Sequence, residues 1–572
     1  MSMLRAYFKK PIALLVIIVL IGSFIRLYNL ADIPSGFHED EAHIGYNAYS
    51  LLKTGKDKNG VFLPLAIDQF GDFRPSGLHF LTVPSVAAFG LNEFATRFPV
   101  AIFGILSIIV LYFLSLEIFK NKAVSVIAAA MLSLNPWHII ASRSTSESIV
   151  SLFFVMLGIF WILKAIRVQK KQLIIFLLGF VSLFISFLFY HAARYFVPFF
   201  LVYLFYLVLA QKKTRVVFAV FGAILAACLL FLMTYSSGAG RPAEISIFST
   251  KATDITLYRQ KMEDIGQNPL ITRFFHNKFV DYSFVALTNY GKHFSPDFLF
   301  FQGGLPPRYM VPWNGNFYLV DGIFILSGLF FLTLLLYQKE KSTSFLFIPV
   351  VWVLLGPIPA AFTFEDIPHF QRSIMMLPGL ILIAAYGAYM LAITLKGRRR
   401  QVILSVLGIL LAYNLLSFMH DYFHHLNLHN AIYRNEGEKD LVLSLKKIQK
   451  DYSSILVTSA NANNLIFYLF YDKIDPAYFQ SIGSPRDKDG LRFQGMTFVT
   501  QDCPSYNTRK IEKTALVQQD SPTIFVDKGE CLIYEAVETV KNVKRSDGTV
   551  AYRILKLKPG YTFNHDLLYP KK

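Results

Sequence analysis

Gln172-Leu-Ile-Ile-Phe-Leu-Leu-Gly-Phe-Val-Ser-Leu-Phe-Ile-Ser-Phe-Leu-Phe189 is the stretch of sequence that decides the fold. It holds no charged side chain, and as an α-helix it is long enough to cross most of a hydrocarbon core of roughly 30 Å. Similar apolar blocks recur along the 572 residues, of which 54% are hydrophobic and only 16% are charged. Soluble domains carry about 25% charged residues. The composition therefore excludes a water-soluble fold and indicates a polytopic α-helical membrane protein.

A window of about 19 residues predicts about eleven transmembrane helices. The first apolar block continues into Arg26-Leu-Tyr28 without a small-residue cleavage site, so we interpret it as an uncleaved span rather than a signal peptide. The apolar stretch from Ser76 to Gly90 is short, and we predict an interfacial or re-entrant helix there. The predicted spans are residues 11–27, 97–119, 123–141, 147–166, 172–189, 195–210, 216–235, 317–337, 344–362, 370–392 and 401–419.

Lys and Arg residues gather in every second connection between the predicted spans, as in Lys120/Lys122 and Arg398/Arg399/Arg400. The formal net charge of +18 is thus spread over connections and does not form a nucleic-acid-binding stripe. The positive-inside rule places these connections and the N-terminus in the cytoplasm. The long connections are then extracytoplasmic: the first outer loop 28–96, the large outer loop 236–316 and the C-terminal tail.

We predict a membrane domain over residues 1–420 and a small extracytoplasmic α/β domain over 421–572. Of three cysteines, Cys228 lies in an apolar block, whereas Cys503 and Cys531 lie in the tail, where a disulfide is stable. A bridge and two buried thiols are both compatible with the sequence. The elements expected in the tail are a helix over 437–451, a strand over 454–459, a helix after Asn461, and strands at 523–526 and 551–557.

The first outer loop opens with Phe37-His-Glu-Asp-Glu-Ala-His-Ile-Gly-Tyr-Asn-Ala-Tyr49, which places three acidic residues just beyond the first span. Ala42, Tyr46, Tyr49 and Leu52 form an apolar stripe at helical spacing, and Gly55 is a helix stop. One reading is therefore structural: the acids of the first turn complement the helix dipole. The other is chemical, because a carboxylate at this place can act as a general base.

The order of features resembles the C superfamily of membrane glycosyltransferases, in particular its protein O-mannosyltransferase and aminoarabinose lipid A transferase branches. The resemblance rests on a single N-terminal span, the acidic run, Phe73-Arg-Pro-Ser-Gly-Leu-His-Phe80, and Asn92-Glu-Phe-Ala-Thr-Arg-Phe-Pro99 before the second span. It covers roughly residues 10–400 and is most specific over residues 26–120. It implies a sugar donor on a polyprenyl-phosphate carrier and an extracytoplasmic protein, lipid or polysaccharide acceptor.

The resemblance further implies that Asp40, followed by Glu41, is the catalytic base. A hydroxyl or amine that attacks an anomeric carbon needs a group to take its proton, and the phosphate leaving group needs no acid, so the reaction should invert the anomeric centre. Two departures from the family pattern bear on this assignment. Glu39 makes the acidic run Glu-Asp-Glu, and Arg74-Pro-Ser76 stands where the family often has a basic residue before two prolines.

An anionic donor requires cations at the outer ends of helices. Each such arginine also has a simpler reading as a contact to lipid headgroups. In the second outer connection, Arg143 is expected to hold phosphate and Glu147 to orient the base or the acceptor. The full set of expected site residues is Asp40, Glu41 and Glu147 for catalysis, and Arg74, Arg97, Arg143, Arg194, Arg241 and Arg372 for the donor.

No resident metal is expected. His420 with His424 and His425 with His429 have the i, i+4 spacing of a zinc site on a helix, but their place after the last span fits an interfacial belt better. A divalent cation is compatible with the resemblance, since some relatives use one. A transporter or flippase is the main rival, although few charges lie inside the spans and no inverted repeat is seen. A non-catalytic envelope polysaccharide assembly protein is the third alternative.

Overall fold

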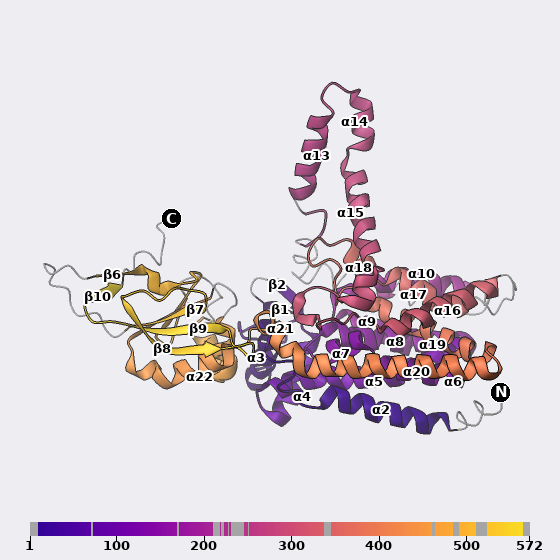
Figure 1. The fold of residues 1–572 in the computed structure, drawn as a ribbon, viewed down its shortest axis with the longest axis horizontal. Coiled ribbons are helices and arrows are strands. Elements are labelled where there is room, and N and C mark those ends of the chain that lie inside the picture. Colours follow the sequence, from indigo (N-terminus) through magenta and orange to yellow (C-terminus); the bar gives the residue numbers. More distant parts are fainter. Residues whose placement is uncertain are drawn as a thin grey trace. The chain divides into compact units, whose positions relative to one another are not determined.

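The computed structural model describes residues 10–69, 72–168, 171–209, 245–249, 251–336, 345–459, 464–483, 491–510 and 523–563, with single positions between 218 and 229. The chain divides into two compact units. We call Met1–Tyr28, Asp72–Leu78 and Val100–Tyr422 the helical unit, and Asn29–Gly71, His79–Pro99 and Phe423–Lys572 the mixed unit. Parts of the first outer loop thus share a unit with the C-terminal tail (Figure 1).

The helical unit carries the apolar helices, and ten of the eleven predicted spans coincide with them. Most of the remaining one, 216–235, lies outside the described residues. Within the described part, five helices are long and apolar enough to cross a membrane, or six if a bent pair counts as one, so the total of eleven is not confirmed. The helices and strand are α2 (Pro11–Leu27), β2 (Asp72–Pro75), α5 (Glu93–Phe119, which begins in the mixed unit), α6 (Lys122–Leu134), α7 (Pro136–Ser142), α8 (Glu147–Arg167), α9 (Gln172–Phe187), α10 (His191–Leu209), α13 (Lys251–Glu263), α14 (Pro269–Phe275), α15 (Lys278–Lys292), η2 (Asp297–Phe301), η3 (Pro307–Tyr309), α16 (Leu319–Leu336), α17 (Ile348–Leu355), α18 (Ile358–Ala361), η5 (Ile374–Met376), α19 (Leu377–Thr394) and α20 (Gly397–His420).

Glycines let α16 and α19 pack backbone against backbone. A Cβ atom at Gly387 would lie 2.0 Å from the carbonyl oxygen of Phe324, and one at Gly328 would lie 2.1 Å from that of Ile383. Helices in lipid gain little from burying apolar surface, so close contact between small residues is what holds them together. Any larger residue at Gly328 or Gly387 would force these two helices apart.

A buried arginine closes the break between α6 and α7, which are bent by 55°. Pro136 at the start of α7 offers no amide proton, so carbonyls at the end of α6 lose helical partners. Arg26 of α2 replaces these partners by donating to the carbonyl oxygens of Ser133 (2.9 Å) and Leu132 (3.2 Å). Unsatisfied backbone groups are too costly to leave in hydrocarbon. The charged side chain of Arg26 thus has a structural role inside the helical unit.

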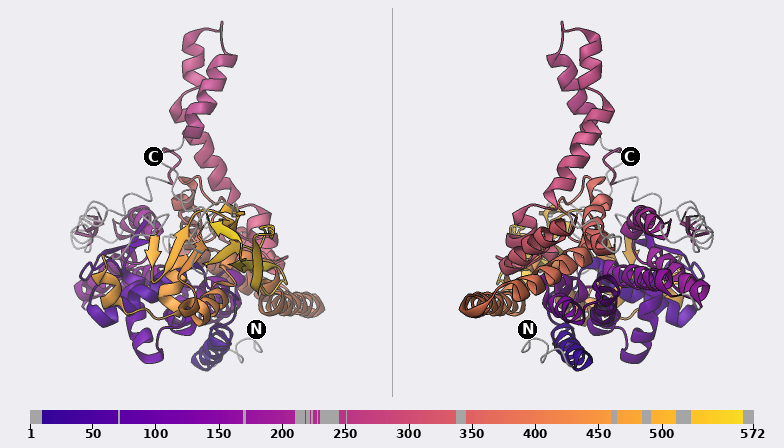
Figure 2. Two further views of the ribbon diagram at one scale, coloured as in Figure 1. Left: turned by 90° about the vertical axis from the view of Figure 1, so that its left-hand side faces the viewer. Right: turned by 90° about the vertical axis from the view of Figure 1, so that its right-hand side faces the viewer.

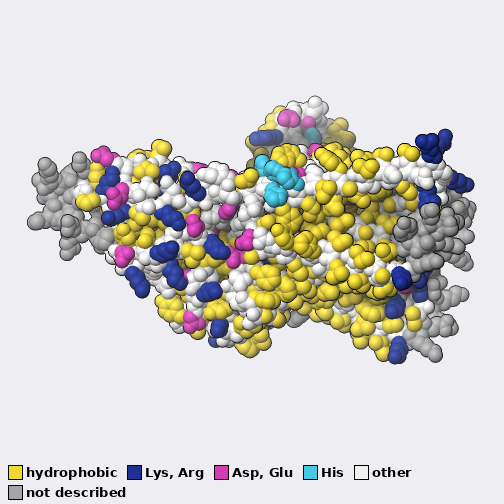
Figure 3. Space-filling model, turned by 60° about the horizontal axis from the view of Figure 1, so that its bottom comes forward, with side chains coloured by type: hydrophobic (Ala, Val, Ile, Leu, Met, Phe, Trp, Pro, Cys, Tyr) yellow, Lys and Arg dark blue, Asp and Glu magenta, His cyan; other side chains and the backbone are white. Residues whose placement is uncertain are grey.

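The surface of the helical unit matches a lipid environment. Figure 3 shows a broad apolar face. Among the exposed apolar side chains of this unit are Ile409 and Leu416 of α20, each 69% exposed. Such exposure is unfavourable in water but neutral against acyl chains, which agrees with a multi-pass membrane protein.

The mixed unit is built around a six-stranded sheet of order β4-β5-β3-β7-β9-β8. Its central strand β3 pairs in parallel with β5 and β7, whereas β9 runs antiparallel to β7 and β8. The helix, strands and second helix predicted in the tail are confirmed, and the short strands were not foreseen. The elements are α3 (Glu39–Thr54), β1 (Ala66–Gln69), α4 (Gly77–Phe89, which begins in the helical unit), η6 (Asp421–His425, which also begins there), α21 (Leu426–Asn430), η7 (Ile432–Arg434), α22 (Glu438–Ile448), η8 (Gln449–Asp451), β3 (Ser454–Thr458), α23 (Asn464–Tyr471), α24 (Pro476–Ser481), β4 (Leu491–Phe493), β5 (Met496–Val499), η9 (Pro504–Asn507), β6 (Thr508–Lys510), β7 (Thr523–Lys528), β8 (Val537–Lys544), β9 (Val550–Leu557) and β10 (Tyr561–Phe563).

Helix α3 of the first outer loop is a core element of the mixed unit. Its Tyr46 is fully buried in one apolar cluster with Phe470 of α23 and strand residues of the sheet. A Cβ atom at Gly45 would lie 2.5 Å from the Phe470 ring, so glycine is what permits this close packing. The helix ends at Gly55 in the left-handed conformation (φ 70°), as predicted. The C-terminal tail therefore holds the helix that bears the acidic run.

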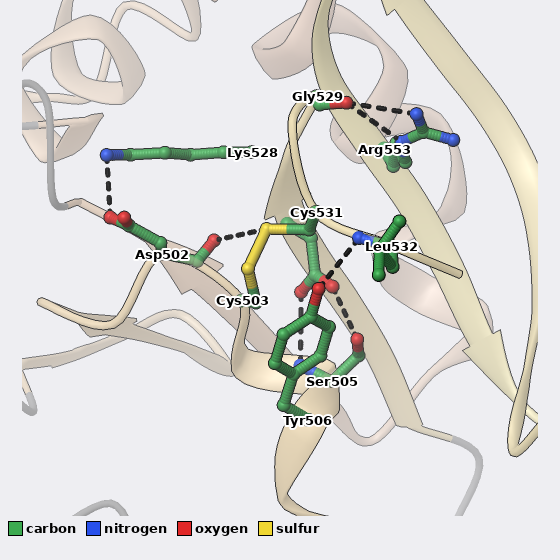
Figure 4. The surroundings of a disulfide bond; sticks show 10 residues. Asp502, Cys503, Ser505, Tyr506, Lys528, Gly529, Cys531, Leu532 and Arg553 are labelled. Carbon is green, nitrogen blue, oxygen red and sulfur yellow. Dashed lines mark hydrogen bonds and ion pairs between the residues drawn. A yellow bond between two sulfur atoms is a disulfide. The ribbon is translucent and has the colours of Figure 1, made fainter. Parts of the chain in front are cut away.

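Cys503 and Cys531 form a disulfide, which decides between the two alternatives left open by the sequence. The bridge joins the segment after β5 to the segment after β7 (Figure 4). Nearby, Lys528 forms an ion pair with Asp502 at 2.6 Å, and the amide of Leu532 donates to the Tyr506 hydroxyl at 2.7 Å. These contacts hold the two loops together at the carboxyl ends of the parallel strands β5 and β7.

Replacing both Cys503 and Cys531 by serine should lower the free energy of unfolding of the mixed unit by about 3 to 4 kcal/mol, because the bridge closes a loop of 28 residues. Pulse proteolysis of the full-length protein across a urea series measures this loss. Cys228→Ser is the matched control and should change nothing. Equal stability of the double variant and the parent would contradict the expectation.

Candidate functional site

Glu41 and Arg97 form a buried ion pair in the mixed unit. Arg97 Nε and Nη2 donate to the two carboxylate oxygens of Glu41, each at 3.0 Å, and the Arg97 side chain is fully buried. Arg434 of the tail donates a third bond to Glu41 Oε2 at 3.2 Å and is also buried. Two cations thus share one carboxylate. Arg434 was missed by the sequence analysis, because nothing in its local sequence marks it.

Arg97 also organises the chain that leads into α3. Its guanidinium donates to four backbone carbonyls, those of Leu30, Ala31, Pro34 and Gly36, at 2.7 to 3.2 Å. All five of its N–H groups are therefore used within the mixed unit. This geometry gives Arg97 and Glu41 a structural role, which is to fix the segment immediately before Asp40.

Asp40 is the second residue of α3 and lies where the fixed segment enters the helix. A capping box sets this start: the Asp40 amide donates to His38 Nδ1 at 3.2 Å, and the His38 amide donates to Glu41 Oε2 at 3.2 Å. The Asp40 carboxylate lies 3.5 Å from His38 Nδ1 and its side chain is 16% exposed. The backbone of Asp40 is thus held from both sides while its carboxylate keeps access to solvent.

Three of the expected site residues come together in the helical unit. Arg74 Nη1 lies 3.9 Å from Glu147 Oε1, the first residue of α8. Tyr190, between α9 and α10, interacts electrostatically with Arg74, Glu147 and Arg372, and burial raises the pKa of its phenol. We call Arg74, Glu147, Tyr190 and Arg372 the polar cluster. Two arginines beside a phenol and a carboxylate can receive a phosphate group.

Arg372 is held in place by the loop after α18. It donates to Thr363 Oγ1 at 3.1 Å, to the Glu365 carbonyl at 2.9 Å and to the Glu365 carboxylate at 3.0 Å. Its own amide donates to His369 Nδ1 at 3.1 Å. The side chains of Thr363 and Glu365 and the Glu365 carbonyl therefore orient the Arg372 guanidinium.

A buried histidine supports the same loop. Burial lowers the pKa of His293 to about 4, so the ring is neutral near pH 7. Its Nδ1 donates to the Asn289 carbonyl at 2.8 Å, and its Nε2 accepts from the His369 amide at 3.0 Å. The neutral tautomer with the proton on Nδ1 satisfies both bonds.

The other expected donor ligands have backbone partners. Arg143 is buried and donates to the carbonyls of Ile25 (2.6 Å) and Tyr28 (2.8 Å), which fixes the end of α2. Arg194 donates to the Phe187 carbonyl at the end of α9. Arg241 lies outside the described residues. Across the described part of the chain, no group of three or more His, Cys, Asp or Glu side chains could hold a metal ion.

Residues 16–235 match the family model of dolichyl-phosphate-mannose-protein mannosyltransferases. The resemblance to membrane glycosyltransferases of the C superfamily is confirmed. The region that matches the family model contains Asp40, Arg74 and Glu147, whereas Arg372 and Arg434 lie beyond it.

One curated relative is dolichyl-phosphooligosaccharide-protein glycotransferase 2 of Archaeoglobus fulgidus, 28% identical over 169 residues. The alignment covers 27% of this chain and only 28% of that glycotransferase. ArnT from Cupriavidus metallidurans in the apo state matches with a TM-score of 0.52 at 12% identity, over 98% of this chain and 99% of ArnT, which shows a shared fold. The oligosaccharyltransferase AglB of Archaeoglobus fulgidus, in complex with an inhibitory peptide and a dolichol-phosphate, gives a TM-score of 0.47 at 14% identity, over 81% of this chain and 64% of AglB.

Arg97→Met should destabilise the mixed unit by about 3 to 5 kcal/mol, because it leaves the Glu41 charge buried beside a single remaining cation. Lys439→Met is the matched control, since Lys439 pairs with Glu93 at 2.8 Å but is 56% exposed, and it should cost at most about 1 kcal/mol. Urea unfolding of both full-length variants gives the comparison. A similar loss of unfolding free energy in the two variants would show that the buried ion pair stabilises the protein no more than the exposed one.

Proposed function

We propose that this protein is a glycosyltransferase that moves a sugar from a polyprenyl-phosphate carrier to an extracytoplasmic acceptor, with Asp40 as the general base. The observation that carries the proposal is the match of residues 16–235 to a family of transferases described by their dolichyl-phosphate-mannose donor. The name of the archaeal relative also describes a dolichyl-linked donor. The acceptor is a protein hydroxyl, a lipid or a polysaccharide.

The proposed chemistry needs one base and one place for an anion. Asp40 takes the proton of the acceptor hydroxyl while the oxygen of that hydroxyl attacks the anomeric carbon of the sugar. The bond from that carbon to the carrier phosphate oxygen breaks, and the electron pair leaves with the phosphate. A single displacement inverts the anomeric centre. The environment of Asp40 supports this role, because its helix start is fixed by the capping box and its side chain is 16% exposed.

The polar cluster is proposed as the binding site of the carrier phosphate. Arg372 is oriented by Thr363 and Glu365, so little side-chain entropy is lost when it binds an anion. Arg74 Nη1 and Glu147 Oε1 lie 3.9 Å apart, which is too long for a hydrogen bond, so Arg74 can still donate hydrogen bonds to a phosphate. Glu147 is proposed to keep Arg74 in this place or to orient the acceptor.

Asp40→Asn should lower turnover by about 10²- to 10⁴-fold, the usual contribution of a general base, while donor binding persists. The assay offers purified protein a panel of polyprenyl-phosphate sugars with an acceptor mixture and measures release of the bare carrier. Glu39→Gln is the matched control one residue away and should keep most activity. Full activity of Asp40→Asn would refute the assignment, and a loss confined to Glu39→Gln would move the base by one position.

Arg372→Gln should weaken donor binding by about 10- to 100-fold, since a charge-assisted hydrogen bond contributes about 1.5 to 3 kcal/mol. At saturating donor its kcat should change little, because the group binds the phosphate equally before and during reaction. Lys292→Gln removes an exposed cation of the same unit and serves as control. An unchanged KM for the donor in Arg372→Gln would remove the polar cluster from the proposal.

A further inference from the structure

Helices α13, α14 and α15 form an arm of the helical unit, residues 251–292, that the glycosyl-transfer proposal does not use. The arm is rooted beside the loop after α18. The buried side chain of Asn289 donates to the Thr363 carbonyl at 2.9 Å, and the Tyr290 hydroxyl donates to the Leu354 carbonyl at 2.8 Å. That loop is one of the connections predicted to be extracytoplasmic. The arm therefore leaves the helical unit at the level of the outer connections.

The arm does not run parallel to the apolar helices of the helical unit (Figure 1). Figures 1 and 2 show α13 and α15 running across the direction of α16, α19 and α20 rather than along it. Transmembrane helices tilt by about 20° from the bilayer normal on average. A hairpin that crosses them at their outer ends consequently runs along the membrane surface.

The arm exposes apolar side chains from residue 255 to residue 287. Phe279 is 80% exposed, Leu270 74% and Phe274 72%, and each would be costly in water. The exposed residues follow helical spacing, which places them in stripes rather than scattering them. The stripes are Ile255, Tyr258, Met262 and Ile265 on α13 with the residues after it, Leu270 and Phe274 on α14, and Val280, Phe284 and Leu287 on α15.

Cationic side chains lie between these stripes. A hollow of about 400 Å³ in the arm is lined by Lys261, Arg273, His276 and Lys278, with Asp254 as its acidic member. Asp254 pairs with Lys278 at 2.9 Å, and Asp264 pairs with His276 at 2.8 Å. No ion pair involves Lys261 or Arg273 among the residues that the structure describes. These two exposed charges complement anionic headgroups.

We propose that the arm is a membrane-surface anchor. Its apolar stripes enter the boundary between headgroups and acyl chains of the leaflet at the outer connections, and Lys261 and Arg273 bind the phosphates of anionic lipids there. Helices with Phe and Leu on one side and Lys and Arg on another bind bilayers in this way. The arm already lies along the surface of the membrane that the other helices cross, so no further protein is needed to cover it.

The test uses the full-length Phe274→Trp variant reconstituted into vesicles of phosphatidylglycerol and phosphatidylcholine. The parent protein has four tryptophans, so the fluorescence of the introduced tryptophan is the difference between the emission of the variant and that of the parent. This difference reports the position of the arm. Brominated acyl chains should quench this added emission at least several-fold more strongly than water-soluble acrylamide does. Leu532→Trp, at a 70% exposed position of the mixed unit, calibrates quenching by acrylamide.

The charge of the arm is tested in the same variant. Replacing Lys261 and Arg273 by glutamine should reduce quenching by brominated phosphatidylglycerol and leave quenching in pure phosphatidylcholine unchanged. Glutamines at the exposed Lys447 and Lys450 of the mixed unit are the matched control and should have no effect.

Two outcomes would overturn the proposal. Quenching by acrylamide but not by brominated lipid would place the arm in water. Protection from both quenchers would mean that protein covers the arm, either a second copy of the chain or another partner. Conservative Phe→Trp exchange at an exposed position leaves folding intact, so either result bears on the position of the arm.

Discussion

The bidentate pair between Glu41 and Arg97 is the interaction on which the rest of the mixed unit depends. Arg97 gathers four carbonyls of the segment before α3, and Glu41 caps the start of that helix through the His38 amide. A buried pair of this kind stabilises little compared with apolar residues of equal volume. Its role is geometric, because it fixes the backbone from which α3 starts and on which Asp40 lies.

The helical unit solves a different problem, which is to satisfy polar groups without water. Arg26 binds carbonyls at the α6–α7 break, Arg143 binds those at the end of α2, and Arg194 binds the one at the end of α9. Each arginine sits where a helix stops and its last carbonyls lack partners. Arg74 and Arg372 have carboxylate partners and remain the better candidates for an anionic substrate.

The apolar blocks of the sequence predicted most helices, because a span must be long and uncharged whatever its neighbours are. Gly55 as the stop of α3 was equally readable, since the signal is local. The partner of Glu41 was not: Arg434 lies 393 residues away, and its contact exists only after the tail folds around α3. The predicted roles of Glu41, Arg97 and Arg143 in catalysis or donor binding rest on residue type and family position. The contacts that these side chains make to backbone carbonyls or to a buried partner could not be predicted from either.

The disulfide has a consequence for how the protein is made. Both of its cysteines lie beyond α20, so the bond closes only after the helices of the helical unit have been synthesised. Disulfides form and persist in oxidising compartments, so the bond also requires that a thiol oxidant reaches these two cysteines. Production in a host without such an oxidant would yield protein whose sheet lacks this disulfide. Labelling with a thiol-reactive reagent would distinguish the oxidised from the reduced form, because only the reduced form has free thiols at Cys503 and Cys531.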